Sequence, residues 1–309
     1  MYFINLEIEK MVVMNILVVI GLFFGSCNND EFTESTAGSK LSDIAYADLS
    51  SAQRMDIYLP EGTGPFPVVV LIHGGAFKMG DKGMEASNAA ALVAKGIAAA
   101  SINYRLSGEA RYPAQIEDCK AAVRFLRANA AKYNLNPDKI GSWGASAGGN
   151  LSSLLGTTSG VSELEGASLG NSSYSSKVIA SVDWFGPINF LTMDAEASAL
   201  GFTINTNSAS SPESQLIGAA VQTVPEKVAK ANASTYITTD DAAFFIQVGS
   251  MDHNIPYTQS LNFYNALKPV KGAENVTYEL LEGAGHGGSQ FSSSANLAKV
   301  VAFFEKYLK

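Results

Sequence analysis

The sequence of 309 residues has few of the side chains that bind metals or form disulfide bonds. Its two cysteines, Cys27 and Cys119, are too few for a disulfide-based scaffold. No CxxC or HExxH pattern and no cluster of histidine, cysteine and carboxylate residues occurs, so nothing indicates a metal site. Any reaction that needs an imidazole must use one of only three histidines, which are His73, His253 and His286.

Positive charge is also scarce. Charged residues make up 16% of the chain, and 21 lysines and arginines face 29 aspartates and glutamates, which gives a net charge of −8. We therefore expect neither nucleic acid nor an anionic membrane surface as a partner.

Hydrophobic residues make up 47% of the chain, which is enough for one large α/β domain with a sizeable core. The sequence leaves the oligomeric state open.

The longest apolar run, residues 11–24, is too short to span a bilayer comfortably but suits the core of a signal peptide. It ends at Gly25-Ser26-Cys27, which resembles a bacterial lipoprotein cleavage site. We therefore predict a lipoprotein-type signal peptide over residues 1–26, lipidation of Cys27 and a polar tether over 27–44. The protein would be exported and lipid-anchored to the outer membrane or cell surface, or periplasmic. The alternative is a plain secretory signal followed by an incidental cysteine.

Strand and helix patterns alternate from about residue 45 to the end. Continuous apolar runs predict buried strands, and apolar residues three or four apart predict a helix that begins near Pro113 and buries Cys119. The predicted strands are 68–72, 97–102, 139–143, 243–248 and 276–281. This alternation indicates an α/β fold with a mostly parallel sheet and helices on both faces. Functional sites in such sheets lie at the carboxyl ends of the strands.

Residues 144–148, GASAG, fit the pattern G-x-S-x-G between a predicted strand and a predicted helix. In that setting the serine occupies a strained turn that exposes its hydroxyl, and the positions two before and two after it accept only very small side chains. A glycine- and serine-rich loop could match the pattern by chance. The strand before it and the helix after it favour Ser146 as a nucleophile.

The segment HGGAF at 73–77 directly follows the strand predicted at 68–72. Glycines let the backbone approach a substrate closely, and fixed backbone amides stabilise the oxyanion of a tetrahedral intermediate. We predict that the amides of Gly75 and Ala76, together with that of Ala147 after the nucleophile, form the oxyanion hole. We interpret His73 as a residue that braces this loop.

A serine nucleophile needs an imidazole base and a carboxylate that orients it. His286 lies in a glycine-rich loop after the last predicted strand, and Asp252 follows the strand at 243–248, which gives the order serine, acid, histidine. Rival acids are Asp183, which precedes the expected cap, and Asp240 and Asp241, which precede the strand. Chain order disfavours His253 as the base and places it at the rim.

These motifs resemble those of the hormone-sensitive-lipase-like esterases, most of all the branch that holds bifunctional feruloyl and acetyl-xylan esterases. The resemblance extends over NYRLS at 103–107, residues 112–130, DWFGP at 183–187, SPESQLIG at 211–218 and residues 249–260. It implies an α/β-hydrolase domain over 45–309, with a cap at about 156–215.

The resemblance also implies activity without a metal or organic cofactor. The expected substrates are short acyl or aryl esters, such as acetyl or feruloyl esters on plant polysaccharide, and the membrane is contacted only through the lipid anchor. The alternative is a general carboxylesterase or lipase. Candidate pocket walls, each of which could instead be ordinary core packing, are Phe77, Trp184, Phe185 and Tyr257.

Two other classes of protein fit the sequence less well. Serine peptidases of this fold usually carry a second, substrate-gating domain, for which this chain is too short. A non-catalytic binding lipoprotein built on an inactive hydrolase would normally have lost the serine or the histidine. Both Ser146 and His286 are present, so we predict a serine esterase.

Overall fold

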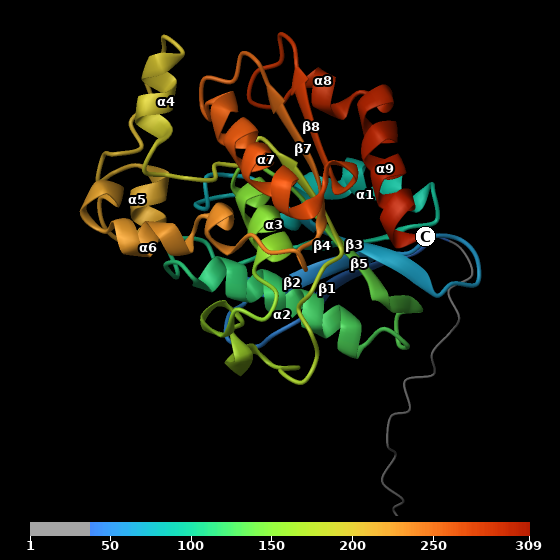
Figure 1. Ribbon diagram of the computed structural model, residues 1–309. Coiled ribbons are helices and arrows are strands. Elements are labelled where there is room, and N and C mark those ends of the chain that lie inside the picture. The colour runs from blue at the N-terminus through green and yellow to red at the C-terminus, as the bar shows by residue number, and fades with distance from the viewer. Residues whose placement is uncertain (1–37) are drawn as a thin grey trace, which may run out of the picture. The chain divides into compact units, whose positions relative to one another are not determined.

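The computed structural model describes residues 38–309, which form an eight-stranded sheet with helices on both faces (Figure 1). The strand order is β1-β2-β4-β3-β5-β6-β7-β8. The predicted signal peptide, Cys27 and tether residues 27–37 lie outside the described residues. The fold class predicted from the sequence is confirmed, because β3 to β8 run parallel as expected.

The sheet begins earlier in the chain than expected. Lys40–Ala45 forms β1, which pairs antiparallel with β2, Arg54–Tyr58, and β2 pairs antiparallel with β4. The predicted tether boundary at residue 44 is therefore wrong, since residues 40–44 belong to the domain. The polar composition of this segment concealed it, because an edge strand buries little of its side chains.

Six parallel strands form the rest of the sheet. They are β3 (Phe66–Ile72), β4 (Ala98–Ile102), β5 (Leu135–Ala145), β6 (Ala180–Trp184), β7 (Ala243–Gly249) and β8 (Val276–Leu281). The five strands predicted from the sequence are confirmed, and β6 was not predicted. Its residues, ASVDW, are all buried, but a serine and an aspartate interrupt the apolar pattern.

Helices cover the two faces of the sheet unequally (Figure 1). One face carries α1 (Ala86–Val93) and α9 (Ser294–Leu308), and the short α8 (Ser289–Ser292) packs against α9. The other face carries α2 (Ala114–Ala128), α3 (Ala147–Thr157) and α7 (Tyr257–Lys271). Cys119 on α2 is completely buried, as its place in the apolar stripe predicted.

The insertion between β6 and β7 contains three short α-helices, α4 (Met193–Ala199), α5 (Pro212–Ile217) and α6 (Pro225–Lys230), at the left of Figure 1. The segment from 158 to 179 instead packs against α2, where Lys120 Nζ lies 2.7 Å from Glu165 Oε1. The predicted cap boundaries of 156–215 are therefore wrong. They combine the end of α3, a loop on α2, β6 and only the first part of the insertion.

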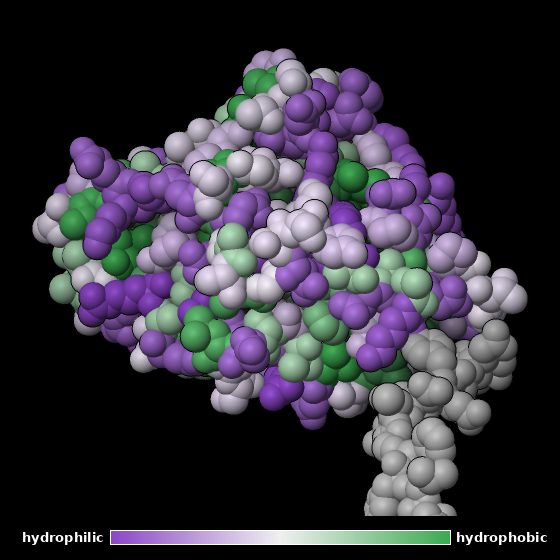
Figure 2. Space-filling view, turned by 90° about the horizontal axis from the view of Figure 1, so that it is seen from below, coloured by the Kyte–Doolittle hydropathy of each residue, from purple (hydrophilic) through white to green (hydrophobic). Residues whose placement is uncertain are grey.

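The described residues contain no helix that is both long and apolar enough to cross a bilayer. On the coloured part of the face in Figure 2, hydrophobic residues occur in small patches between hydrophilic ones. Such scattered apolar residues are normal on a protein surface and do not indicate a binding face.

A buried ion pair ties α2 to the segment after β4. Arg105 Nε donates to Asp118 Oδ2 at 2.9 Å and Arg105 Nη2 to Asp118 Oδ1 at 2.8 Å, while Gln53 Nε2 donates to the same carboxylate at 2.7 Å. The backbone amide of Arg105 also donates to Asp118 Oδ2. Asp118 thereby fixes the 103–107 segment, which contacts the 73–77 loop described below.

Replacing Asp118 by asparagine should strongly destabilise the fold. The substitution removes the buried carboxylate that Arg105 contacts most closely and leaves only Glu117, 3.7 Å away, as its negative partner. Breaking a buried pair of this kind typically costs about 3 kcal/mol of unfolding free energy. Urea denaturation of the Asp118→Asn protein measures this loss, and Glu109→Gln, which neutralises an exposed carboxylate nearby, is the matched control. An Asp118→Asn protein as stable as the control would contradict the structural role of the pair.

Candidate active site

The turn between β5 and α3 presents Ser146. Its backbone has φ 55° and ψ −121°, a conformation that is strained for any residue with a Cβ, and its amide donates to the carbonyl oxygen of Trp184 at 2.8 Å. A Cβ at Gly144 would lie 2.0 Å from the carbonyl oxygen of Gly148, and a Cβ at Gly148 would lie 2.0 Å from the carbonyl oxygen of Ile72. Only glycine fits at both positions, so the motif has the structural context that its pattern predicted.

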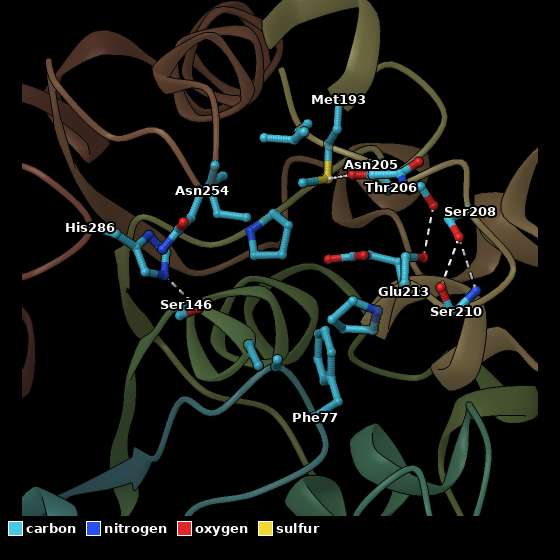
Figure 3. Close-up of a pocket in the computed structure, with 17 residues that line it drawn as sticks. Phe77, Ser146, Met193, Asn205, Thr206, Ser208, Ser210, Glu213, Asn254 and His286 are labelled. Atoms are coloured by element: carbon cyan, nitrogen blue, oxygen red, sulfur yellow. Dashed lines mark hydrogen bonds between the residues drawn. The ribbon is translucent and has the colours of Figure 1, made fainter. Parts of the chain in front are cut away.

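Ser146, His286 and Asp252 form a continuous chain of hydrogen bonds. His286 Nε2 lies 2.9 Å from Ser146 Oγ, and His286 Nδ1 lies 2.7 Å from Asp252 Oδ2 (Figure 3 shows the first of these contacts). An ionised carboxylate can only accept, so Nδ1 carries the proton and Nε2 offers its lone pair to the serine hydroxyl. In this tautomer His286 can take the proton from Ser146.

Asp252 is held by the turn that follows β7. Its side chain is fully buried, and Oδ1 accepts hydrogen bonds from the amides of Asn254 and Ile255, each at 2.9 Å. These two bonds fix the carboxylate and leave Oδ2 for His286. The three residues come from loops after β5, β7 and β8, so the parallel sheet brings their side chains together at one edge.

The rival residues lie elsewhere. Asp183 accepts from Ser153 Oγ at 2.9 Å and from the Gly186 amide at 2.8 Å, and burial raises its pKa to about 6. Asp241 accepts from the amide and hydroxyl of Thr238, and Asp240 lies in the same turn before β7. His253 is exposed and stacks on Phe202.

The 73–77 loop is held by its carbonyl oxygens. The Tyr104 hydroxyl donates to the carbonyl oxygen of His73 at 3.0 Å, and the Ser107 amide donates to the carbonyl oxygen of Phe77 at 2.7 Å. His73 Nδ1 donates to the carbonyl oxygen of Gly74 at 2.7 Å. The carbonyl oxygen of Gly75 accepts from the amides of Lys78 and Met79, directly after the loop. His73 also stacks on Tyr104 with ring centroids 4.5 Å apart, so it braces the loop as interpreted, and burial lowers its pKa.

The amides predicted for the oxyanion hole have no partners within the described residues. The amides of Gly75 and Ala76 donate to none of them, and that of Ala147 belongs to the first turn of α3, where helical amides lack acceptors. Ala76 and Ala147 line the same cavity as Ser146 and His286. Gly75 has φ 117°, and a Cβ there would lie 2.0 Å from the Met79 carbonyl oxygen, so this position requires glycine.

The cavity beside Ser146 has a volume of about 430 Å³. Its wall on the sheet side includes Phe77, and its opposite wall comes from the insertion between β6 and β7 (Figure 3). The residues of that insertion that line the cavity are Pro187, Met193, Ile204, Asn205, Thr206, Ser208, Ser210, Ser211, Pro212 and Glu213. Six of these ten residues carry hydroxyl, amide or carboxyl groups, so this wall offers hydrogen-bonding groups within a cavity whose surface is otherwise largely apolar.

Of the four predicted wall residues, Phe77 lines this cavity and the other three do not. The Phe185 ring packs behind His286 with centroids 4.7 Å apart, and Trp184 donates its indole N–H to Gln247. Tyr257 packs against the same aromatic and aliphatic core. Phe185 thus packs against the imidazole, and Trp184 packs against Phe185 with ring centroids 6.5 Å apart.

Sequence reasoning missed Glu213 and Asn254 as cavity residues. Glu213 appeared only within the segment SPESQLIG, where Ser211 caps α5 and Pro212 occupies its first turn. Among residues 38–309, no group of three or more histidine, cysteine or carboxylate residues could hold a metal ion.

The sequence and the fold both match known proteins. The sequence matches the BD-FAE family over residues 55–267. Esterase LipC of Mycobacterium tuberculosis is 30% identical over 249 residues, which cover 79% of this chain and 59% of that protein. This chain therefore spans less than two thirds of the length of LipC.

Two solved structures share both fold and sequence with the chain. A truncated carbohydrate esterase from gut microbiota has a TM-score of 0.80 and 34% identity, covering 89% of this chain and 98% of that one. A bifunctional GH43-CE protein of Bacteroides eggerthii has a TM-score of 0.78 and 38% identity, covering 86% of this chain and 35% of that one. The chain therefore belongs to the BD-FAE family and has the fold of the α/β-hydrolases.

Proposed function

We propose that this protein is a serine carboxylic-ester hydrolase, and the observation that carries the proposal is the hydrogen-bonded chain Asp252–His286–Ser146. Ser146 Oγ attacks the ester carbonyl carbon while His286 Nε2 takes its proton. Asp252 holds the imidazole in the required tautomer and stabilises the imidazolium. His286 then protonates the leaving alkoxide, and the acyl group remains on Ser146. A water molecule repeats the attack, which releases the acid and restores the serine.

The negative oxygen of each tetrahedral intermediate would bind to the amides of Gly75, Ala76 and Ala147. The carbonyl oxygens of Gly74 and Gly75, which share peptide units with the amides of Gly75 and Ala76, already accept hydrogen bonds from neighbouring residues of the chain. The carbonyl oxygen of Ser146, which shares its peptide unit with the Ala147 amide, accepts from the Asn150 amide, so the three amides need no rearrangement at the moment of reaction. Preorganised donors of this kind typically contribute about 3 kcal/mol each to transition-state stabilisation.

For the substrate we infer short acyl or aryl esters on a carbohydrate, such as acetyl or feruloyl groups on xylan. The polar wall formed by the insertion supports this, since hydroxyl and amide groups suit a sugar better than a lipid chain. The similarity to a carbohydrate esterase from gut microbiota and to a bifunctional GH43-CE protein supports the same inference. The similarity to LipC keeps a general carboxylesterase as the second candidate.

Replacing Ser146 by alanine should lower kcat for p-nitrophenyl acetate by about 10⁴- to 10⁶-fold, because the nucleophile is removed while the oxyanion hole remains. A fluorophosphonate probe should label the parent protein and the control Ser173→Ala, whose serine is exposed and lies outside the cavity. It should not label Ser146→Ala. A Ser146→Ala protein with the parental rate would exclude the mechanism, and an unlabelled parent would favour a binding protein.

The substrate class is tested by comparing acetylated xylan, methyl ferulate and p-nitrophenyl acetate with the purified protein. We expect release of acetate or ferulate from the first two at kcat/KM values at least comparable with that for p-nitrophenyl acetate. Cleavage of p-nitrophenyl acetate alone would leave the serine esterase intact and favour the general carboxylesterase.

We also propose export of the protein and lipid attachment at Cys27, on the basis of the apolar run at 11–24 and the small residues before the cysteine. In a bacterial host, radiolabelled palmitate should enter the parent protein, and a Cys27→Ser variant should lose the label. Cys119 remains in that variant, so label retained there would show attachment at another position and contradict the lipoprotein signal.

A further inference from the structure

A buried carboxylate faces the cavity outside the hydrogen-bonded triad. Glu213 lies in the first turn of α5, directly after Pro212, and is 8% exposed. In Figure 3 its carboxylate extends from α5 into the cavity, toward the side on which Ser146 and His286 lie. The ester-cleaving mechanism proposed above makes no use of this group.

Glu213 has no cationic partner among the described residues. The single proton of the adjacent Ser211 hydroxyl is directed at the carbonyl oxygen of Thr206, 2.8 Å away, and the same oxygen accepts from the Ser214 amide at 3.0 Å. The pKa of Glu213 is raised because burial outweighs the hydrogen bonds from its own amide and from Ser211, and the negative charge of Asp194 adds to the rise. A carboxylate in this position is costly for the fold, and a ligand that donates hydrogen bonds to it would offset the cost.

The surroundings indicate which ligand that is. The residues that line the cavity include no lysine or arginine, and with Glu213 and nearby Asp194 the site disfavours an anion. The neighbouring polar residues Asn205, Thr206, Ser208, Ser210 and Asn254 are neutral groups that both donate and accept. A neutral molecule rich in hydroxyl groups can donate to the carboxylate and exchange hydrogen bonds with the others.

We propose that Glu213 determines substrate specificity by accepting hydrogen bonds from free hydroxyl groups of the sugar that carries the ester. This inference rests on the proposed function, since it concerns the part of the same substrate that extends beyond the reacting carbonyl. Glu213 holds the sugar ring while Ser146 and His286 act on its acyl group. A hydrogen bond to an ionised carboxylate is stronger than one to a neutral acceptor, so the charge itself contributes to selectivity.

The test compares three acetates of similar size that differ in the group attached to the ester oxygen. A monoacetate of methyl xyloside carries hydroxyl groups on a six-membered ring, cyclohexyl acetate has a similar ring without them, and acetylcholine carries a positive charge. We expect Glu213→Gln to lower the ratio of kcat/KM for the xyloside to that for cyclohexyl acetate by about tenfold or more, mainly through KM. The control Glu226→Gln, which changes an exposed glutamate on α6, should keep the parental ratio.

Each other result overturns the proposal. A ratio within twofold of the parent would show that the carboxylate does not select for hydroxyl groups. A specific loss of acetylcholine cleavage would assign it to a cation. An equal loss on all three esters with a lower melting temperature would make it structural, whereas we expect Glu213→Gln to melt no lower than the parent. A parent that cleaves cyclohexyl acetate but not the xyloside would leave the esterase standing without this specificity, and a parent that cleaves none would overturn the esterase as well.

Discussion

The contact between α3 and the end of the sheet leaves no space for a side chain at Gly144 or Gly148. Cβ atoms at these positions would meet backbone oxygens at 2.0 Å, which no local adjustment of a side chain could relieve. This approach forces the chain to turn sharply at Ser146 and holds that residue at φ 55°. Because the strained turn is fixed by packing, the serine hydroxyl has a defined position. The imidazole and the oxyanion-hole amides can act only if they are placed correctly around that hydroxyl.

The groups around Ser146 are fixed from the side away from the cavity. Four carbonyl oxygens of the 73–77 loop accept hydrogen bonds, and the 103–107 segment that supplies two of these contacts is itself tied to α2 through Arg105 and Asp118. His286 is supported by the ring of Phe185, and Asp252 by two backbone amides. The donors and the base are therefore oriented before any substrate binds, which is the condition for electrostatic stabilisation of a transition state.

The two sides of the cavity have different origins. The sheet edge supplies Ser146, His286, Asp252 and the 73–77 loop, which are the groups that the proposed acyl transfer uses. The insertion between β6 and β7 supplies the opposite wall, including Glu213, and under our proposal its polar groups select the alcohol. Reaction and selectivity thus depend on separate segments, so the fold alone does not define the substrate.

The sequence by itself determined the parts of this protein that depend on local pattern. Local sequence patterns predicted β3, β4, β5, β7 and β8. The glycines around Ser146 and in the 73–77 loop, together with chain order, predicted the residues that meet at the site. Only the tertiary structure showed that residues 40–45 pair with β2, that β6 is a central strand despite Ser181 and Asp183, and that Phe185 packs against His286. It also showed that the cavity wall comes from residues 187–213 and includes Glu213. Periodicity and close backbone approach are encoded within a few residues, whereas the side chains that face a cavity are decided by contacts between segments far apart in the chain.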